Sequence, residues 1–323
     1  MITSECEIDK SPNVLVSKII DDKYRVLQSG KAYGDAKPFV NSEDECMLQL
    51  SQVAPHAWTF VWPDIYDELV DEFNAGCEAY EAGDLDNARG IFQAALSQMP
   101  DHLDAIHHLA IVLSELSLVD EARNLWEQAV RIGRKAFPKD IEIGKDRLEW
   151  GWLENRPFLR CLHGLALVRY EEDKIEEALR LFHELLSLNP NDNQGVRAMA
   201  LEALFKLGKF EDALKIAEQY PDDAMSETMY GRALALFKLG QRQEATMALQ
   251  EAVEYLPLVG KELSKTKHRL PKTASPGFIT MGGADEAYYY WERWGQFWEE
   301  DPEALEWLRG TMRQTTKPRR CAG

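Results

Sequence analysis

Small, aromatic and aliphatic positions recur along this chain at an interval of 34 residues, or close to it. In residues 69–102 they are Gly76, Gly83, Ala88, Phe92, Ala95, Leu96 and Pro100, and in residues 226–259 they are Ala233, Gly240, Ala245, Leu249, Ala252, Val253 and Pro257. Apolar residues three and four positions apart share one face of a helix. Each interval therefore predicts two amphipathic helices joined by a short turn.

One alanine in the second predicted helix sets the register of the repeats. It is found at Ala88, Ala122, Ala178, Ala213 and Ala245, with separations of 34, 56, 35 and 32 residues. The separation of 56 equals one repeat of 34 plus an insert of 22. The pattern therefore predicts helix pairs in residues 69–102, 103–136, 159–192, 194–225 and 226–259, the fourth cut short at Tyr220-Pro221.

A unit with this period and these small positions resembles the tetratricopeptide repeat. The resemblance implies an all-α fold, a right-handed solenoid of about five helix pairs with N- and C-terminal caps. Glycines stand where the chain turns between paired helices, at Gly83, Gly208 and Gly240. Because proline cannot continue a helix, Pro100, Pro190 and Pro257 are expected to end second helices.

A second resemblance covers roughly residues 150–310. It rests on Asn155-Arg156-Pro157-Phe158-Leu159-Arg160, on the run from Asn189 to Arg197, and on Pro302-Glu303-Ala304-Leu305-Glu306-Trp307-Leu308. These segments resemble microbial tetratricopeptide proteins related to the suppressor-of-tumorigenicity seven family. The resemblance implies an interaction role and brings no catalytic residue.

Residues 1–68 and the insert, residues 137–158, do not fit the repeat. Ser42 and Glu45 have the spacing of a helix start, and residues 45–68, with alternating Trp58, Phe60 and Trp62, are expected to form an ordered cap. The order of residues 1–40 stays open. In the insert, Phe137, Trp150, Trp152 and Phe158 either pack as a local core or present a binding surface. Asn155 is expected to cap the next helix, and Pro157 suits its first turn.

Residues 260–323 depart from the repeat again. A long loop is predicted over residues 264–283, followed by a helix from Ala284 with Tyr290, Trp294, Phe297 and Trp298 on one stripe. This stripe is expected to be buried against the solenoid, either capping its end or occupying its concave groove. A short basic tail is predicted from Arg313.

Charge narrows the choice of partners. The net charge of −18 over 323 residues argues against nucleic acid, because phosphate contacts need clustered lysine and arginine. Five widely spaced cysteines indicate a reducing compartment. The acidic start does not resemble a secretory signal, and without a run of 18 apolar residues no membrane span is expected. We therefore expect a cytoplasmic protein with no membrane partner, of unknown oligomeric state.

No catalytic, cofactor or metal site is predicted. His102, His107 and His108 come nearest to a metal cluster, but adjacent helical residues point about 100° apart, so His107 and His108 do not suit one site. Asp101 is expected to cap the following helix, while Cys77 and Cys161 are expected to be packed thiols.

The expected function is that of a non-catalytic protein–protein interaction scaffold. The first helix of each repeat presents its positions 2, 5, 9 and 12 to the concave groove, and those chosen as partner-binding are Phe73, Cys77, His107, Ile111, Arg160, His163, Leu167, Arg197, Tyr230 and Leu234. Phe73 and Cys77 replace the Lys and Asn that grip a C-terminal carboxylate in tetratricopeptide chaperone adaptors. The groove instead suits an amphipathic helix or an extended peptide. The alternative is a regulatory or substrate-presenting subunit of an enzyme complex.

Overall fold

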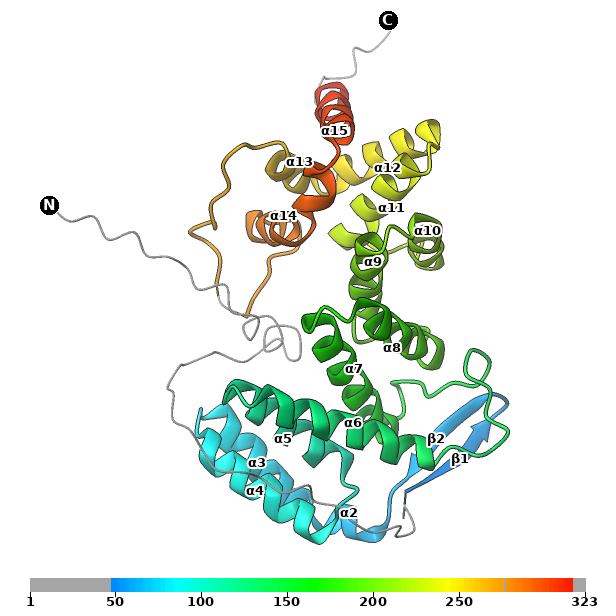
Figure 1. The fold of residues 1–323 in the computed structure, drawn as a ribbon, viewed down its shortest axis with the longest axis vertical. Coiled ribbons are helices and arrows are strands. Elements are labelled where there is room, and N and C mark those ends of the chain that lie inside the picture. Colours follow the sequence, from blue (N-terminus) through cyan, green and yellow to red (C-terminus); the bar gives the residue numbers. More distant parts are fainter. Residues whose placement is uncertain (1–47, 276, 316–323) are drawn as a thin grey trace, which may run out of the picture. The chain divides into compact units, whose positions relative to one another are not determined.

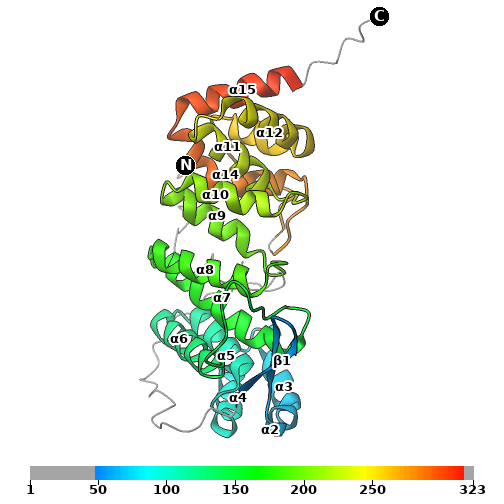
Figure 2. The same cartoon turned by 90° about the vertical axis from the view of Figure 1, so that its right-hand side faces the viewer.

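A computed structural model of the chain describes residues 48–275 and 277–315 (Figure 1). The chain divides into two compact units between Asn193 and Gln194. Each unit consists mainly of helices, as the second view also shows (Figure 2).

Unit 1 combines a β-hairpin with three helix pairs. Its elements are β1 (Gln49–Ala54), β2 (Ala57–Val61), α2 (Asp64–Glu68), α3 (Val70–Glu81), α4 (Leu85–Gln98), α5 (Leu103–Glu115), α6 (Val119–Lys135), the 3-10 helix η1 (Leu153–Asn155), α7 (Arg156–Glu171) and α8 (Ile175–Leu188). The pairs are α3 with α4, α5 with α6, and α7 with α8.

Unit 2 contains two further pairs and three C-terminal helices. Its elements are α9 (Val196–Lys206), α10 (Phe210–Gln219), α11 (Ser226–Lys238), α12 (Arg242–Tyr255), α13 (Pro257–Leu263), α14 (Ala284–Glu299) and α15 (Pro302–Thr315). The tetratricopeptide-type helical fold with five pairs is thereby confirmed over residues 70–255. α10 ends at Gln219, just before Tyr220-Pro221, which makes it shorter than the other second helices.

The turns inside the pairs share a left-handed backbone five residues before each register alanine. The φ angles are 76° at Gly83, 66° at Gly208 and 76° at Gly240, positive values that glycine adopts without steric strain. The same position holds Ser117 with φ 62° and Asp173 with φ 58°. The turn geometry is thus common to all five pairs, although glycine is not.

The register alanines lie at the centre of the helix contacts. Ala88, Ala122, Ala178, Ala213 and Ala245 are all fully buried. In the second pair the aromatic four residues later, Trp126, is also fully buried. A Cβ on Gly164 would lie 2.5 Å from Nε1 of Trp126, so this glycine lets α7 approach α6 closely.

The hairpin of unit 1 was not predicted as strands. β1 and β2 pair antiparallel, with Leu50 opposite Phe60. A lone two-stranded hairpin is at best marginally stable in water, so it needs support from the rest of the unit. The backbone N–H of Trp58 donates to the carbonyl of Arg147 at 2.9 Å, and that of Arg147 donates to the carbonyl of His56 at 2.9 Å. The predicted helix start at Ser42 and Glu45 lies outside the described residues.

The prediction for Asn155 was wrong, although Pro157 does stand in the first turn of α7. The side chain of Asn155 makes no capping hydrogen bond. Instead Oδ1 accepts from the N–H of Phe60 at 3.1 Å, while Nδ2 donates to the carbonyls of Trp58 at 3.0 Å and Glu149 at 3.1 Å. Asn155 is fully buried, so it fastens the hairpin to the start of the third pair.

The four aromatic side chains of the insert differ in burial. Phe137 and Phe158 pack against Phe60 at ring distances of 6.4 Å and 5.4 Å, and of the two Phe158 is fully buried while Phe137 is half-buried. Trp150 is half-buried, with the guanidinium of Arg156 5.1 Å from its ring. Trp152 keeps 43% of its surface exposed. Only Trp152 therefore offers a wide aromatic surface to solvent.

The aromatic stripe of α14 is buried, as predicted, with Tyr290, Trp294, Phe297 and Trp298 all in the core of unit 2. Two helices around it were not predicted. Pro257 begins α13 as well as following α12, and Arg313 belongs to α15 rather than to a tail. Residues 316–323 lie outside the described residues. No described helix is both long and apolar enough to cross a membrane.

Candidate partner-binding surfaces

Seven of the ten predicted groove residues belong to α3, α5 and α7, the first helices of the three pairs, and we call the surface that these helices expose the inner face of unit 1. Phe73 and Cys77 on α3 are half-buried, and the side chain of Arg160 on α7 is 34% exposed. The other predicted members are buried, namely His107, Ile111, His163 and Leu167. Phe73, Cys77 and Arg160 are therefore the predicted residues of this unit that a partner could reach.

Rings form a continuous row between the hairpin and this inner face. Trp62 stacks on Tyr66 with centroids 4.5 Å apart, and Tyr66 lies 4.6 Å from the ring of His102. Phe73 continues the row, stacking on His102 at 5.5 Å and meeting His108 edge-on at 5.0 Å. The row holds α2 against α3 and α5 and so fixes the side chain of Phe73.

An ion pair lies beside the row of rings. Nη1 of Arg160 donates to Oδ1 of Asp104 at 2.9 Å, and the hydroxyl of Tyr66 donates to Oδ2 of the same carboxylate at 3.4 Å. Burial and the adjacent Asp104 charge raise the pKa of Tyr66. The guanidinium of Arg160 also lies 5.6 Å from the ring of Trp150. Arg160 is thus a positioned cation at the edge of an aromatic surface.

Two histidines of this region, His102 and His107, are buried. Nε1 of Trp126 donates to Nδ1 of His107 at 3.1 Å, and burial lowers the pKa of His107 well below its ordinary value. His102, not Asp101, caps α5, because its Nδ1 accepts from the N–H of Ala105 at 3.1 Å. Burial lowers the pKa of His102 to about 4. Among the described residues no group of His, Cys, Asp and Glu could hold a metal ion.

Cys161 is a packed thiol. It is fully buried, its Sγ donates to the carbonyl of Leu103 at 3.3 Å, and burial raises its pKa well above the ordinary value. A thiol kept protonated in this way is a poor nucleophile.

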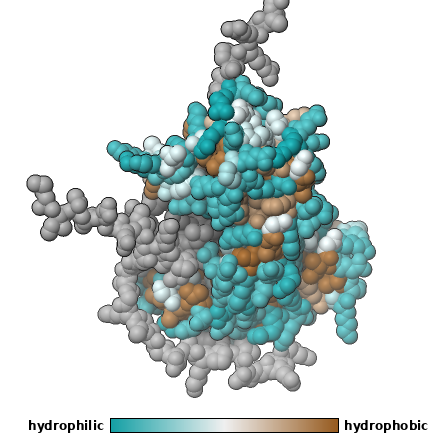
Figure 3. All heavy atoms as spheres, turned by 45° about the horizontal axis from the view of Figure 1, so that its top comes forward, coloured by the Kyte–Doolittle hydropathy of each residue, from teal (hydrophilic) through white to brown (hydrophobic). Residues whose placement is uncertain are grey.

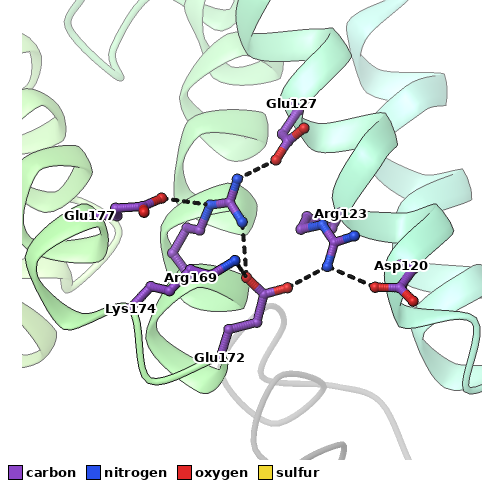
Figure 4. A network of polar contacts seen from close by, with 7 residues as sticks. All are labelled: Asp120, Arg123, Glu127, Arg169, Glu172, Lys174 and Glu177. Carbon is purple, nitrogen blue, oxygen red and sulfur yellow. Dashed lines mark hydrogen bonds and ion pairs between the residues drawn. The ribbon is translucent and has the colours of Figure 1, made fainter.

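A charged network joins the second and third helix pairs (Figure 4). It contains Asp120, Arg123, Glu127, Arg169, Glu172, Lys174 and Glu177. At its centre Glu172 accepts from Arg123 at 2.5 Å, Arg169 at 2.9 Å and Lys174 at 2.9 Å. Burial alone would raise the pKa of Glu172, but these three donors outweigh it and lower the pKa to about 2. Because each central charge is already balanced within the network, it serves to join α6 to α7.

In unit 2 the predicted groove positions are covered by the chain itself. Tyr230 and Leu234 are fully buried, so the prediction that they face an open groove does not describe this structure. Tyr230 lies under α14, with its ring 5.7 Å from Tyr290, and its hydroxyl donates to the carbonyl of Leu256 at 2.9 Å. Arg197 pairs with Asp223 through Nε at 2.7 Å and Nη2 at 3.0 Å.

α14 lies on the inner face of unit 2, on the side of α9 and α11 away from α10 (Figure 1). Trp294 packs edge-on against Phe205 of α9 at 5.0 Å. A Cβ on Gly231 of α11 would lie 3.2 Å from the Trp294 ring, so the indole sits directly on the helix backbone. Arg293 pairs with the buried Glu202 of α9. The aromatic helix therefore occupies the groove face of this unit.

α15 covers the other apolar surface, on the last repeat. Trp307 stacks on Phe237 at 4.5 Å, and its Nε1 donates to Oγ1 of Thr246 on α12 at 3.2 Å. Arg242 pairs with Glu303 at 2.9 Å. Capping the solenoid and filling its groove were the two roles considered for the aromatic helix. Two different helices perform them, because α14 fills the groove face and α15 caps the final pair.

Exposed apolar side chains gather in patches on an otherwise hydrophilic surface (Figure 3). In unit 2 one set stands on the loop between α13 and α14, namely Leu270, Phe278, Ile279 and Met281. In unit 1 a second set, near the end of the hairpin and η1, is Val61, Trp152 and Leu153. The second group borders a cleft of 430 Å³ lined by Thr59, Phe60, Val61, Trp62, Tyr66, Asp67, Trp152, Leu153 and Glu154.

A family model described as Tcf25, transcriptional repressor TCF25, matches residues 78–321. This chain belongs to the Tcf25 family. Among curated proteins none matches it.

Solved structures that resemble this Tcf25-family chain are tetratricopeptide or similar repeat proteins. YrrB, titled a TPR protein with an unusual peptide-binding site, is 18% identical at a TM-score of 0.44, over 60% of this chain and 89% of its own. A putative kinesin light chain repeat protein of Podospora anserina is 17% identical at 0.44, over 60% and 97%. MamA from AMB-1 is 19% identical at 0.43, over 58% and 98%. The helix pairs of the chain itself, rather than these likenesses, establish its fold.

Proposed function

We propose that this chain is a non-catalytic scaffold that binds a peptide or helix of a partner protein on the inner face of its helix pairs. The observation that supports this function most directly is the position of α14. An amphipathic helix, with Trp294 and Tyr290 on its apolar stripe, lies on α9 and α11 within the same chain. The repeats of this protein can therefore hold an aromatic helix, which is a common mode of peptide recognition.

In unit 1 the proposed contacts are Phe73, Cys77 and Arg160. Phe73 offers an aromatic surface held in place by His102 and His108. Arg160 adds a cation whose direction is set by Asp104. A partner segment that fits this face carries apolar side chains at helical or extended spacing and an acceptor for the guanidinium. The buried members of the predicted set contribute by shaping the face and not by touching the partner.

The family name brings in a second consideration. The Tcf25 family is described as a transcriptional repressor. A chain with a net charge of −18 lacks the excess of cations that binding to DNA phosphates requires. Any role of this chain in repression would therefore be exercised through a protein partner.

Several finer predictions stay predictions. They are a cytoplasmic location, a relation to the suppressor-of-tumorigenicity seven family, and the alternative role as a regulatory or substrate-presenting subunit of an enzyme complex. The subunit role would need a partner enzyme, whereas the scaffold role needs only a segment that fits the inner face. Identifying the partner distinguishes these two roles.

Affinity capture from the native cell lysate, with mass spectrometry of the retained proteins, tests the proposal. Phe73→Ala should release a specific partner, because a central aromatic contact typically contributes about 2 kcal/mol or more to binding. Met247→Ala on α12, an exposed apolar residue of an outer helix, is the matched control and should retain that partner. Equal capture by both variants would count against binding at the inner face of unit 1.

A further inference from the structure

The walls of the cleft in unit 1 come from two parts of the chain that are far apart in sequence, residues 59–67 and residues 152–154. β2 contributes Phe60, the segment from Trp62 to Asp67 contributes two stacked rings, and the η1 region contributes Trp152, Leu153 and Glu154. Its volume of 430 Å³ falls within the range of ligand pockets, roughly 300–1,000 Å³. This space accommodates one or two side chains and is too small for a whole helix.

Hydrogen bonds and ring contacts hold these walls in place. Nε1 of Trp62 donates to the carbonyl of Glu154 at 3.1 Å, which ties the α2 side of the cleft to the η1 side. The stack of Trp62 on Tyr66 sets the plane of both rings. Asn155 holds β2 beside η1 through the N–H of Phe60. The cleft is therefore preformed, which lowers the entropy lost when a ligand binds.

The chemistry of the lining favours a cation with an apolar stem. Four of the nine lining residues are aromatic, two are the exposed carboxylates Asp67 and Glu154, and none of the nine is lysine or arginine. Aromatic faces and carboxylates both attract cations. In addition, the hydroxyl of Thr59 is buried without a hydrogen-bond partner among the described residues. Such a group points to a ligand that would satisfy it.

We propose that this cleft binds an arginine side chain of an extended peptide from a partner protein. The methylene stem of the arginine would pack along Trp62 and Trp152, and its guanidinium would pair with Asp67 or Glu154. Arginine fits better than lysine because its planar head group both stacks on rings and pairs with carboxylates through two donors. The inference takes from the proposed function only that the ligand belongs to a partner protein, and the site is distinct from the inner face at Phe73.

The test begins with a library of random 12-residue peptides displayed on phage and selected on the full chain. Clones are then screened for loss of binding to Trp152→Ala. Because 43% of Trp152 is exposed, this variant should fold normally, and its circular dichroism spectrum checks that it does. The expected outcome is a set of Trp152-dependent clones that share an arginine next to apolar residues. The proposal is overturned if no Trp152-dependent clones are obtained. It is also overturned if the Trp152-dependent clones lack a basic residue.

The strongest clone is then synthesised with a fluorescein label, and its Kd is measured by anisotropy. Trp152→Ala should weaken binding about tenfold or more, as loss of an aromatic anchor does. Asp67→Asn combined with Glu154→Gln should weaken it by a smaller factor and flatten its salt dependence. When the peptide arginine is replaced with norleucine, the peptide should no longer bind the wild-type chain more tightly than these variants. Phe278→Ala, an exposed aromatic residue of unit 2, is the control and should change nothing.

Two further measurements separate this site from others. Phe73→Ala should leave the Kd of the cleft peptide unchanged. The inner-face proposal and the cleft proposal can therefore fail independently, the first in the lysate capture and the second in the peptide measurements. Choline serves as a competitor that carries a cation without a peptide. If choline displaces the labelled peptide while norleucine in place of arginine has no effect, the cleft is a site for small organic cations and the proposal is wrong.

Discussion

The side chain of Asn155 accepts a hydrogen bond from the backbone N–H of Phe60, although the two residues are 95 positions apart in the chain. The same side chain donates to the carbonyls of Trp58 and Glu149. One buried amide thus satisfies three backbone groups from the hairpin and the insert. It is one of the contacts that join the N-terminal extension to the repeats.

Replacing Asn155 should therefore destabilise the protein far more than removal of a surface amide. Asn155→Ala leaves buried backbone groups unpaired, at about 1–3 kcal/mol for each group. We expect the free energy of unfolding of unit 1 to fall by at least about 2 kcal/mol in urea denaturation. Asn124→Ala, an exposed change on α6, should stay within about 0.5 kcal/mol of wild type. Similar values for both variants would show that the hairpin is not fastened through Asn155.

The aromatic helix α14 gives a second prediction. Trp294 is fully buried between α9 and α11, so Trp294→Ala should destabilise unit 2 by about 3–5 kcal/mol through lost burial and a residual cavity. Trp152→Ala removes the same side chain from an exposed site and should have a small effect.

Deleting residues 284–323 should lower the melting temperature or cause aggregation, because α14 and α15 cover large apolar surfaces. A truncated protein that melts like the full chain would contradict the structural role of both helices.

Ser117 leads to a prediction of the opposite sign. Its φ of 62° is the left-handed conformation that the equivalent turns adopt with glycine. A residue with a Cβ is disfavoured there by about 1–2 kcal/mol, although glycine loses more entropy on folding. Ser117→Gly should therefore stabilise unit 1 by about 0.5 kcal/mol, visible as a higher melting temperature. The reverse change at the equivalent position, Gly83→Ser, should lower it, and identical shifts for the two variants would exclude the backbone explanation.

Local features made the helix pairs predictable from sequence. Ala88 and its equivalents must be small for paired helices to meet, and Pro190 must follow the end of a helix, so residue type and spacing carried the information. The buried stripe of α14 was predictable for the same reason, because Trp294 and Trp298 repeat with the helical period.

Long-range partners could not be predicted in this way. Asn155 has the residue type and position of a helix cap, and nothing nearby in sequence indicates that Phe60 competes for its side chain. The alternation of Trp58, Phe60 and Trp62 is a strand pattern that could have revealed β2. The cleft was missed because residues 152–154, which form one wall, meet residues 59–67 only in the folded chain.

The buried histidines predict how stability depends on pH. Burial lowers the pKa of His102 from its ordinary value of 6.5 to about 4, and burial lowers that of His163 to about 4 as well. Between pH 6.5 and 4 the unfolded chain therefore binds protons that the folded chain does not. Stability should fall as the pH decreases through this window, because proton uptake favours the state that binds more protons.

A substitution at His102 isolates its share of this effect. His102→Asn keeps a side-chain acceptor that can cap α5 but removes the titrating ring. We expect the decline in the free energy of unfolding between pH 6.5 and 4 to become shallower in this variant, as measured by urea denaturation at a series of pH values. Glu172→Gln is the control. The pKa of Glu172 is about 2, below the ordinary value of 4.5, so the contribution of Glu172 to the free energy of unfolding is lost only as the pH falls below 4.5. If His102→Asn has the wild-type slope above pH 4.5, the imidazole of His102 is not the group whose protonation opposes folding.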